Sequence, residues 1–256
     1  MAQPIERFLA SVERNPDAMA VAGTALGDVS YVRLRRAVDA VAAGFQKLDA
    51  APGSRVGICL ANSFEHLIAL LATYAAGKVW VPLNPRNTRA ELDGMIAMTR
   101  PSILIDDVMH VRALMAEHDG LEAARIARGA EDALIIKFSG GSTGKPKPVV
   151  QSQQCVNAQA DGLRDFFEFR SADVNLIAAP LTHGASCFVL PILEVGGTHV
   201  LVEHPKADAM FDAIATHGVT TLYAPPTLLY SMIEHPHAAG AKLGSLRHVI
   251  YSAAPM

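Results

Sequence analysis

Cysteine is scarce in this sequence, with three residues among 256. Cys59, Cys155 and Cys187 lie far apart and form no Cys-x-x-Cys pair, which argues against a zinc site and against a disulfide framework. Isolated thiols of this kind are typical of ordinary buried cysteines in a reducing compartment. We therefore expect a cytoplasmic protein without disulfides.

The sequence also has no large excess of positive or negative charge, and it has no long apolar run. The formal net charge of -3 at pH 7 gives no electrostatic footprint for nucleic acid or for an anionic membrane surface. No apolar run approaches the ~20 residues that a membrane-spanning helix needs. Residues 1–7 lack the basic-then-apolar order of a signal peptide. The sequence therefore predicts neither a nucleic-acid partner nor a membrane span.

Apolar periodicity, in contrast, is strong along the chain. An apolar run of strand length at residues 55–60 precedes a predicted helix over residues 63–76 and a short buried strand at residues 79–81. Strand, helix and strand joined by brief turns form the βαβ unit of a parallel sheet. The same alternation predicts later strands at residues 174–178, 198–202, 219–223 and 246–251.

The length allows one large domain or two small ones with a substantial core. We expect an α/β fold with two parallel-rich sheets flanked by helices. The first subdomain is predicted over residues 1–130 and the second over residues 131–256, with the boundary in a stretch that carries little pattern.

The most informative stretch is residues 138–147, Phe-Ser-Gly-Gly-Ser-Thr-Gly-Lys-Pro-Lys, which separates two apolar stretches. It predicts a strand, a glycine-rich loop and a second strand. Glycines let the backbone approach a ligand closely, and free N–H groups with hydroxyls and ammonium groups suit the oxygens of a polyphosphate. The stretch is not the common P-loop, because Pro146 follows Lys145 where that motif has Ser or Thr. Taken alone, a solvated hairpin turn is the commoner explanation.

The stretch resembles the phosphate-binding signature of the adenylate-forming (AMP-binding) superfamily, which includes acyl- and aryl-CoA synthetases, adenylation domains of peptide synthetases and luciferases. Two positions depart from the usual pattern, since Gly140 replaces a Ser and Pro148 replaces a Gly. Three further boxes follow the family's order, at residues 77–85, 180–185 and 251–256. We assign the first of these a structural role, because an X-Pro step at Pro82 fixes the end of a strand.

The resemblance implies roles for individual residues. The catalytic residues would be His183 and Lys145. The ATP-binding residues would be Ser139, Gly140, Gly141, Ser142, Thr143, Gly144, Lys145 and Lys147, with Ser252, Ala253, Ala254 and Pro255 against the adenine ring. The substrate-binding residues would be His183, Ala185, Phe188, Tyr223 and Thr227.

Several of these residues also have ordinary explanations. A histidine after Leu-Thr is more often a satisfied surface or core residue, and only the resemblance favours His183 as a site residue. Thr227 fits a strand that two prolines simply terminate. The remaining histidine pairs, His235 with His237 and His199 with His204, have no carboxylate at a convincing ligand spacing, so we expect no metal site.

The resemblance implies an ATP-dependent acid–CoA ligase that uses ATP, Mg²⁺ and coenzyme A on a small carboxylic acid, fatty or aromatic. The family's acidic Mg²⁺ ligand, its ribose-binding Asp and its catalytic C-terminal Lys would lie beyond Met256. We therefore expect a fragment that covers the first half of a ligase, with a truncated N-terminal domain, and a chain that alone forms no acyl-AMP at a useful rate. A non-catalytic nucleotide- or acyl-binding module is the alternative, and a homodimer is compatible with either.

Overall fold

The computed structural model describes residues 2–25, 27–139 and 146–252. They form two compact units that interleave along the chain. The first unit comprises Met1–Leu9, Arg33–Ala61 and Glu65–Gln159, and the second comprises Ala10–Val32, Asn62–Phe64 and Ala160–Met256. This division differs from the single expected boundary near residue 130, because residues 131–159 group with the first unit.

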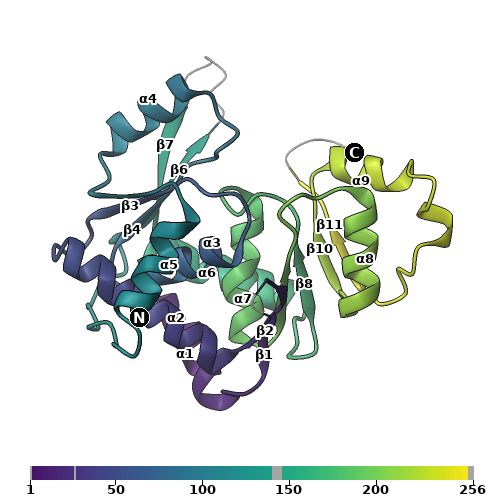
Figure 1. Cartoon of the computed structure of the whole chain (residues 1–256), viewed down its shortest axis with the longest axis horizontal. Coiled ribbons are helices and arrows are strands. Elements are labelled where there is room, and N and C mark those ends of the chain that lie inside the picture. Colours follow the sequence, from purple (N-terminus) through teal and green to yellow (C-terminus); the bar gives the residue numbers. More distant parts are fainter. Residues whose placement is uncertain (1, 26, 140–145, 253–256) are drawn as a thin grey trace. The chain divides into compact units, whose positions relative to one another are not determined.

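The first unit is built on a five-stranded sheet in the order β5-β3-β4-β6-β7 (Figure 1). Pairing is parallel between neighbours except at β6–β7, which is antiparallel. The strands are β3 (Arg55–Ile58), β4 (Val79–Pro82), β5 (Ile103–Ile105), β6 (Ala133–Ser139) and β7 (Lys147–Ser152). The helices that follow the first three strands are α3 (Phe64–Ala75), α4 (Arg89–Thr99) and α5 (Val108–Glu117). The βαβ unit expected from residues 55–81 is therefore confirmed.

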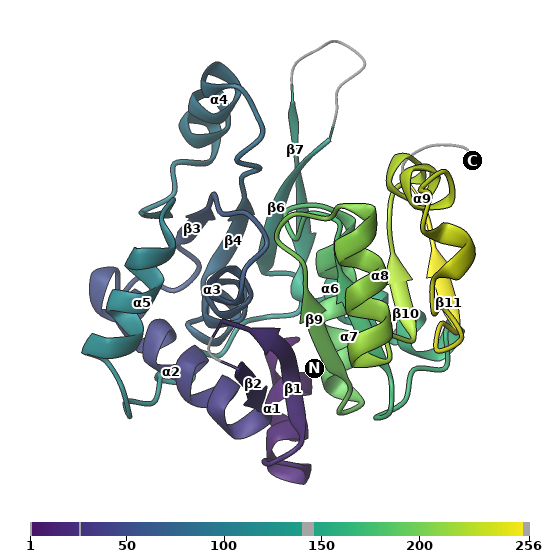
Figure 2. The same cartoon turned by 45° about the vertical axis from the view of Figure 1, so that its right-hand side comes forward.

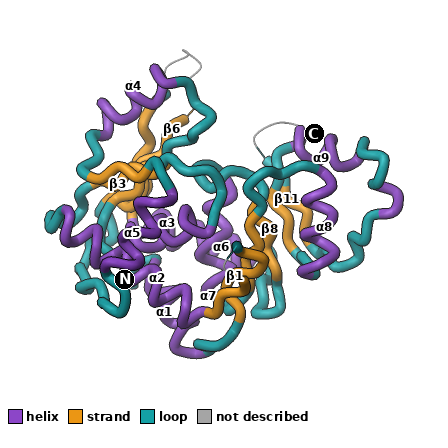
Figure 3. The backbone as a smooth tube through the Cα atoms, viewed as in Figure 1, coloured by secondary structure: helices purple, strands orange, loops and turns teal. Residues whose placement is uncertain are grey.

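The second unit is built on a six-stranded sheet in the order β11-β10-β8-β9-β1-β2, parallel except between β1 and β2 (Figures 2 and 3). Its strands are β1 (Met19–Thr24), β2 (Gly27–Ser30), β8 (Val174–Ile177), β9 (Thr198–Leu201), β10 (Thr221–Tyr223) and β11 (His248–Ile250). Its helical segments are η1 (Gly184–Phe188), α7 (Val189–Glu194), α8 (Ala207–His217), α9 (Pro226–Ile233) and η2 (Ala238–Gly240). The expected α/β class with two mostly parallel sheets is confirmed.

The central strands of the second sheet bury both faces. Leu176, Val200 and Leu222 pack with residues of α8 and α9 in one core cluster. Because side chains alternate along a strand, the neighbouring residues face the other way, where Tyr223 packs with Phe188 of η1 and Ile192 of α7. The parallel strands thus carry their carboxyl ends to one edge of a sheet that is covered on both sides.

Four helices have residues in both units, namely α1 (Ile5–Arg14), α2 (Tyr31–Leu48), α3, of which only Phe64 belongs to the second unit, and α6 (Gln153–Phe166). Tyr31 begins α2 directly after the end of β2 at Ser30. Its phenol is fully buried and donates to the carbonyls of Leu193 and Gly197, at 3.1 and 2.7 Å.

The three cysteines are free thiols, but the expectation that they are buried is wrong, because Cys59 and Cys187 are partly exposed and Cys155 is exposed. It lies in the first turn of α6 on the side that faces solvent, a feature that apolar periodicity over a short window does not resolve. Within the described residues, no helix is both long and apolar enough to cross a membrane.

Candidate functional site

The predicted phosphate loop is flanked by β6 and β7, which confirms the expected strand–loop–strand arrangement. Ser139 pairs with Lys147 at the end of the hairpin, and the Ser139 hydroxyl donates to the Lys147 carbonyl at 3.4 Å. Pro148 lies on β7, which is an edge strand paired only with β6. No further strand lies on the other side of β7, so there the missing N–H of Pro148 removes no hydrogen bond between strands. The predicted ligands Gly140, Gly141, Ser142, Thr143, Gly144 and Lys145 lie outside the described residues, so their roles stay predictions.

His183 lies in the second unit, after β8 and directly before η1. Its side chain is exposed, and Nδ1 lies 2.9 Å from the hydroxyl of Thr182. The Ser186 hydroxyl donates to the His183 carbonyl at 2.8 Å, which ties the residue to the first turn of η1. A short loop at the carboxyl end of a parallel strand thus presents the imidazole, which is where open α/β sheets collect ligands.

The loop before His183 is held by a residue that the sequence analysis did not identify, Asn62. Its buried amide accepts a hydrogen bond from the Leu181 N–H at 2.9 Å and donates one to the Ala179 carbonyl at 2.9 Å. These two bonds fix the backbone on either side of Pro180. Local sequence carries no signal for this role, because Asn62 lies 119 residues away from Leu181 along the chain.

Tyr223 brings together three predicted site segments. Its hydroxyl lies 2.6 Å from the Ser252 hydroxyl, and its ring lies 5.2 Å from the Phe188 ring at an angle of 33°. A Cβ on Gly184 would approach the Tyr223 hydroxyl oxygen to 2.1 Å, so the tyrosine lies directly against the Gly184 backbone. Phe188, Tyr223 and Ser252 therefore form one contact group, next to His183 and the buried Ala185.

The other predicted residues of these segments are less closely joined. Thr227 is exposed in the first turn of α9, and among the described residues no hydrogen bond is recorded between its side chain and this group. Ala253, Ala254 and Pro255 lie outside the described residues, so their predicted contact with adenine is not tested.

Phe188 and Tyr223 belong to a larger aromatic cluster that the sequence analysis missed in part. Phe167 lies 5.5 Å from Phe169 in a stacked arrangement and 6.3 Å from Phe188, measured between ring centroids. His248 of β11 lies 5.4 Å from Phe167. The signal was the run Phe166-Phe167-Glu168-Phe169 at the end of a helix, but its partners come from η1 and β11, and Tyr223 of β10 joins the cluster through Phe188. The cluster is an aromatic core that packs against the Phe188 and Tyr223 side chains.

A row of polar side chains crosses the same sheet face. Register places His248, Thr221, Asn175 and His199 side by side on β11, β10, β8 and β9. Burial lowers the pKa of His199 to about 4, so the ring is neutral at pH 7, with Nδ1 3.1 Å from the Asn175 amide nitrogen and Nε2 3.2 Å from the Val189 carbonyl.

Three buried atoms of this row, His248 Nε2, Thr221 Oγ1 and Asn175 Oδ1, have no hydrogen-bond partner among the described residues. Unpaired buried polar atoms are rare in folded proteins and call for an explanation.

The contact between Gly184 and Tyr223 leads to a prediction. Gly184→Ala is expected to lower the free energy of unfolding by about 1–3 kcal/mol, because the added methyl group overpacks against the phenol. In a Tyr223→Ala background the same substitution is expected to cost under about 1 kcal/mol, since its obstacle is gone. Urea unfolding of the four chains measures both costs, and an equal cost in both backgrounds would contradict this contact.

Comparison with known proteins identifies the family. The model of the family described as AMP-binding enzyme matches residues 8–256. The chain belongs to the AMP-binding family. A feruloyl-CoA synthase from an Amycolatopsis species is 31% identical over 94% of this chain and 52% of that enzyme, and an indoleacetate–CoA ligase from Aromatoleum aromaticum is 30% identical over 87% and 49%. The chain is thus related to acyl- and aryl-CoA ligases of the AMP-binding family, and it spans about half the length of the curated relatives it matches.

Solved structures agree on the fold. The N-terminal domain of FACL13 from Mycobacterium tuberculosis has a TM-score of 0.92, with 21% identity over 100% of this chain and 71% of that chain. ATP-bound MatB from Rhodopseudomonas palustris has a TM-score of 0.86, with 25% identity over 99% of this chain and 56% of that chain. The AMP-binding fold is therefore shared across the whole described chain.

Proposed function

We propose that this chain contributes the ATP and acid sites of an ATP-dependent carboxylic acid–CoA ligase. The observation that carries the proposal is the family match over residues 8–256 together with a hairpin, β6–β7, that flanks the predicted phosphate loop. In the first step a carboxylate oxygen of the acid attacks the α-phosphorus of ATP, and the bond to pyrophosphate breaks. In the second step the thiol of coenzyme A takes the acyl group, and AMP leaves.

The residues of the phosphate loop would hold the β- and γ-phosphates. Lys145 and Lys147 would offset the charge that develops as pyrophosphate departs, and Ser139 would add a hydroxyl donor. His183 would line the carboxylate end of the acid. Mg²⁺ and coenzyme A are part of the proposal through the family, as is a cytoplasmic location, and a homodimer stays open.

The acid is proposed to be apolar and aromatic. Support comes from Phe188, Tyr223 and their aromatic neighbours on one side of the site. The names of two relatives, a feruloyl-CoA synthase and an indoleacetate–CoA ligase, point to the same class.

The nucleotide part of the proposal is tested by calorimetric titration of the chain with ATP and Mg²⁺. We expect saturable binding that Lys147→Ala weakens about tenfold, a loss of about 1.4 kcal/mol for one ammonium–phosphate contact. Lys242→Ala is the matched control, because Lys242 is an exposed lysine in the loop before β11, and it should bind like the wild type. Equal affinities of all three chains would contradict a role of the hairpin, whereas turnover of the chain alone is not expected.

A further inference from the structure

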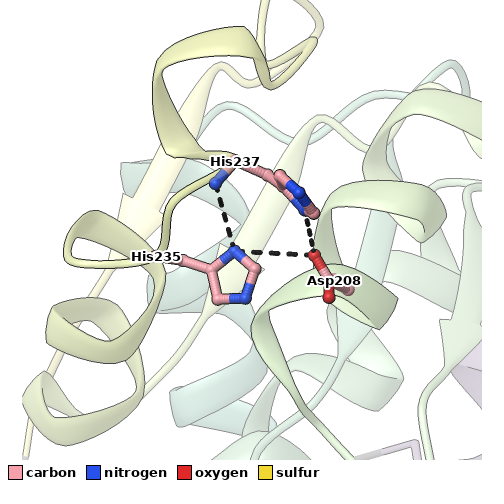
Figure 4. A group of neighbouring side chains, drawn as sticks. All are labelled: Asp208, His235 and His237. Atoms are coloured by element: carbon pink, nitrogen blue, oxygen red, sulfur yellow. Dashed lines mark hydrogen bonds and ion pairs between the residues drawn. The ribbon is translucent and has the colours of Figure 1, made fainter.

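Two histidines and one carboxylate meet on the surface of the second unit, away from Tyr223 and His183 along the chain. Asp208 lies in the first turn of α8, while His235 and His237 flank Pro236 just after α9 (Figure 4). One oxygen, Asp208 Oδ1, lies 2.9 Å from His237 Nδ1 and 3.5 Å from His235 Nδ1. The three groups can each offer a ligand atom within 4.8 Å of the others.

The sequence predicts no metal site, because His235 and His237 have no carboxylate at a convincing ligand spacing. The structure corrects that premise, since the carboxylate of Asp208 reaches His237 from 29 residues earlier in the chain. The fold brings them together since α8 and α9 pack in one core cluster through residues such as Phe211 and Met232.

The two histidines are held in place by their surroundings. The His235 ring lies 6.0 Å from the buried Phe211 ring in an edge-on arrangement. The His235 carbonyl accepts from the Ala238 N–H at 2.9 Å, and the His237 carbonyl accepts from the Gly240 N–H at 3.1 Å. Pro236 between them restricts the backbone further. The ligand atoms are therefore presented by an ordered turn and the start of a helix.

One contact concerns the state of the His235 ring. The His237 backbone N–H donates to His235 Nδ1 at 3.3 Å, so this nitrogen carries a lone pair rather than a proton. Nδ1 lies 3.5 Å from Asp208 Oδ1, and a cation bound by both atoms would replace the weak hydrogen bond from the His237 N–H.

The distances suit a tetrahedral ion. Zinc binds imidazole nitrogen at about 2.0–2.1 Å and carboxylate oxygen at about 2.0–2.2 Å, which places tetrahedral ligand atoms roughly 3.3–3.5 Å apart. The separation of 3.5 Å between His235 Nδ1 and Asp208 Oδ1 matches that value, and the 2.9 Å between His237 Nδ1 and the same oxygen is the length of a hydrogen bond that a bound ion would replace. We propose that Asp208, His235 and His237 bind Zn²⁺ through three protein ligands, with the fourth position open to solvent. The ion would join the start of α8 to the turn that leads toward β11.

The test is calorimetric titration of the full chain with ZnCl₂, after removal of any purification tag, with thermal unfolding as a second readout. We expect wild-type binding at one site, a rise in Tm with Zn²⁺, and at least tenfold weaker binding in both His237→Ala and Asp208→Asn. His237 is largely exposed, with 74% of its side chain accessible, so its loss should not unfold the chain.

His204→Ala serves as the matched control. His204 is an equally exposed histidine, 4.0 Å from the single carboxylate of Glu203, and its replacement should leave zinc affinity unchanged. Zinc binding that is no tighter in the wild type than in His237→Ala would overturn the proposal, as would an equal loss in His204→Ala. Neither result bears on ATP binding at the phosphate loop, so the two proposals fail separately.

Discussion

Replacing Lys78 with methionine is expected to lower the free energy of unfolding by about 3–5 kcal/mol, the range for removal of one partner from a buried charged contact. The Lys78 side chain is only 1% exposed. Its ammonium donates to the carbonyl of Ala51 and the hydroxyl of Ser54, each at 2.8 Å, and to the carbonyl of Asp49. Methionine fills a similar volume but leaves these acceptors unpaired.

The loss of these hydrogen bonds would destabilise the βαβ unit of the first sheet. Lys78 immediately precedes β4, and its hydrogen bonds connect that position to the turn between α2 and β3. Lys47→Met is the control, because Lys47 is 70% exposed and its nearest carboxylate, that of Glu117, lies 3.9 Å away. Urea unfolding should show a change within about 0.5 kcal/mol for the control. A similar small change for Lys78→Met would contradict the role given to these hydrogen bonds.

Asp173→Ala is expected to cost about 3 kcal/mol of unfolding free energy, because several donors lose one buried acceptor. The carboxylate is 1% exposed and accepts from the Thr220 hydroxyl at 2.8 Å, the Arg170 N–H at 2.7 Å and the Arg247 guanidinium at 2.6 Å. Arg247 directly precedes β11, and Thr220 directly precedes β10. Asp173 therefore aligns the strands that lead to Tyr223 and Ser252.

The same carboxylate predicts a dependence of stability on pH. Burial alone would raise the pKa of Asp173, but the hydrogen bonds from Thr220, Arg170 and Arg247 outweigh it and hold the pKa below its ordinary value. A lowered pKa in the folded state stabilises the fold above the unfolded value of about 3.9, and this contribution is lost as the pH falls below that value. Unfolding free energies measured from neutral to acid pH should therefore fall less steeply for Asp173→Asn than for the wild type. Parallel curves would contradict this linkage.

The sequence predicted those features that depend on neighbours along the chain. The apolar runs around residues 55–81 gave the strand, helix and strand as observed, and the glycine-rich stretch gave the hairpin of β6 and β7. These assignments succeed because burial pattern and turn residues act locally. The family resemblance added the order of the boxes, which the family match over residues 8–256 supports.

The sequence could not predict contacts that only the fold creates. Asn62 reaches a loop 119 residues away, and Asp208 meets a histidine pair that looked isolated in the sequence. The lack of a side chain at Gly184 makes room for Tyr223, a residue 39 positions later that the sequence around Gly184 does not indicate. In each case the partner is set by which strands and helices pack together, and no local pattern records that choice.

The central claim is that this chain binds a nucleotide and an aromatic acid as parts of one reaction. A stable analogue of the acyl-AMP intermediate, such as an aryl-sulfamoyl adenosine, tests it most directly in a calorimetric titration of the chain. We expect the analogue to bind at least 100-fold more tightly than AMP, about 2.7 kcal/mol, because it offers both halves at once. An affinity equal to that of AMP, or no saturable binding of either, would contradict the account.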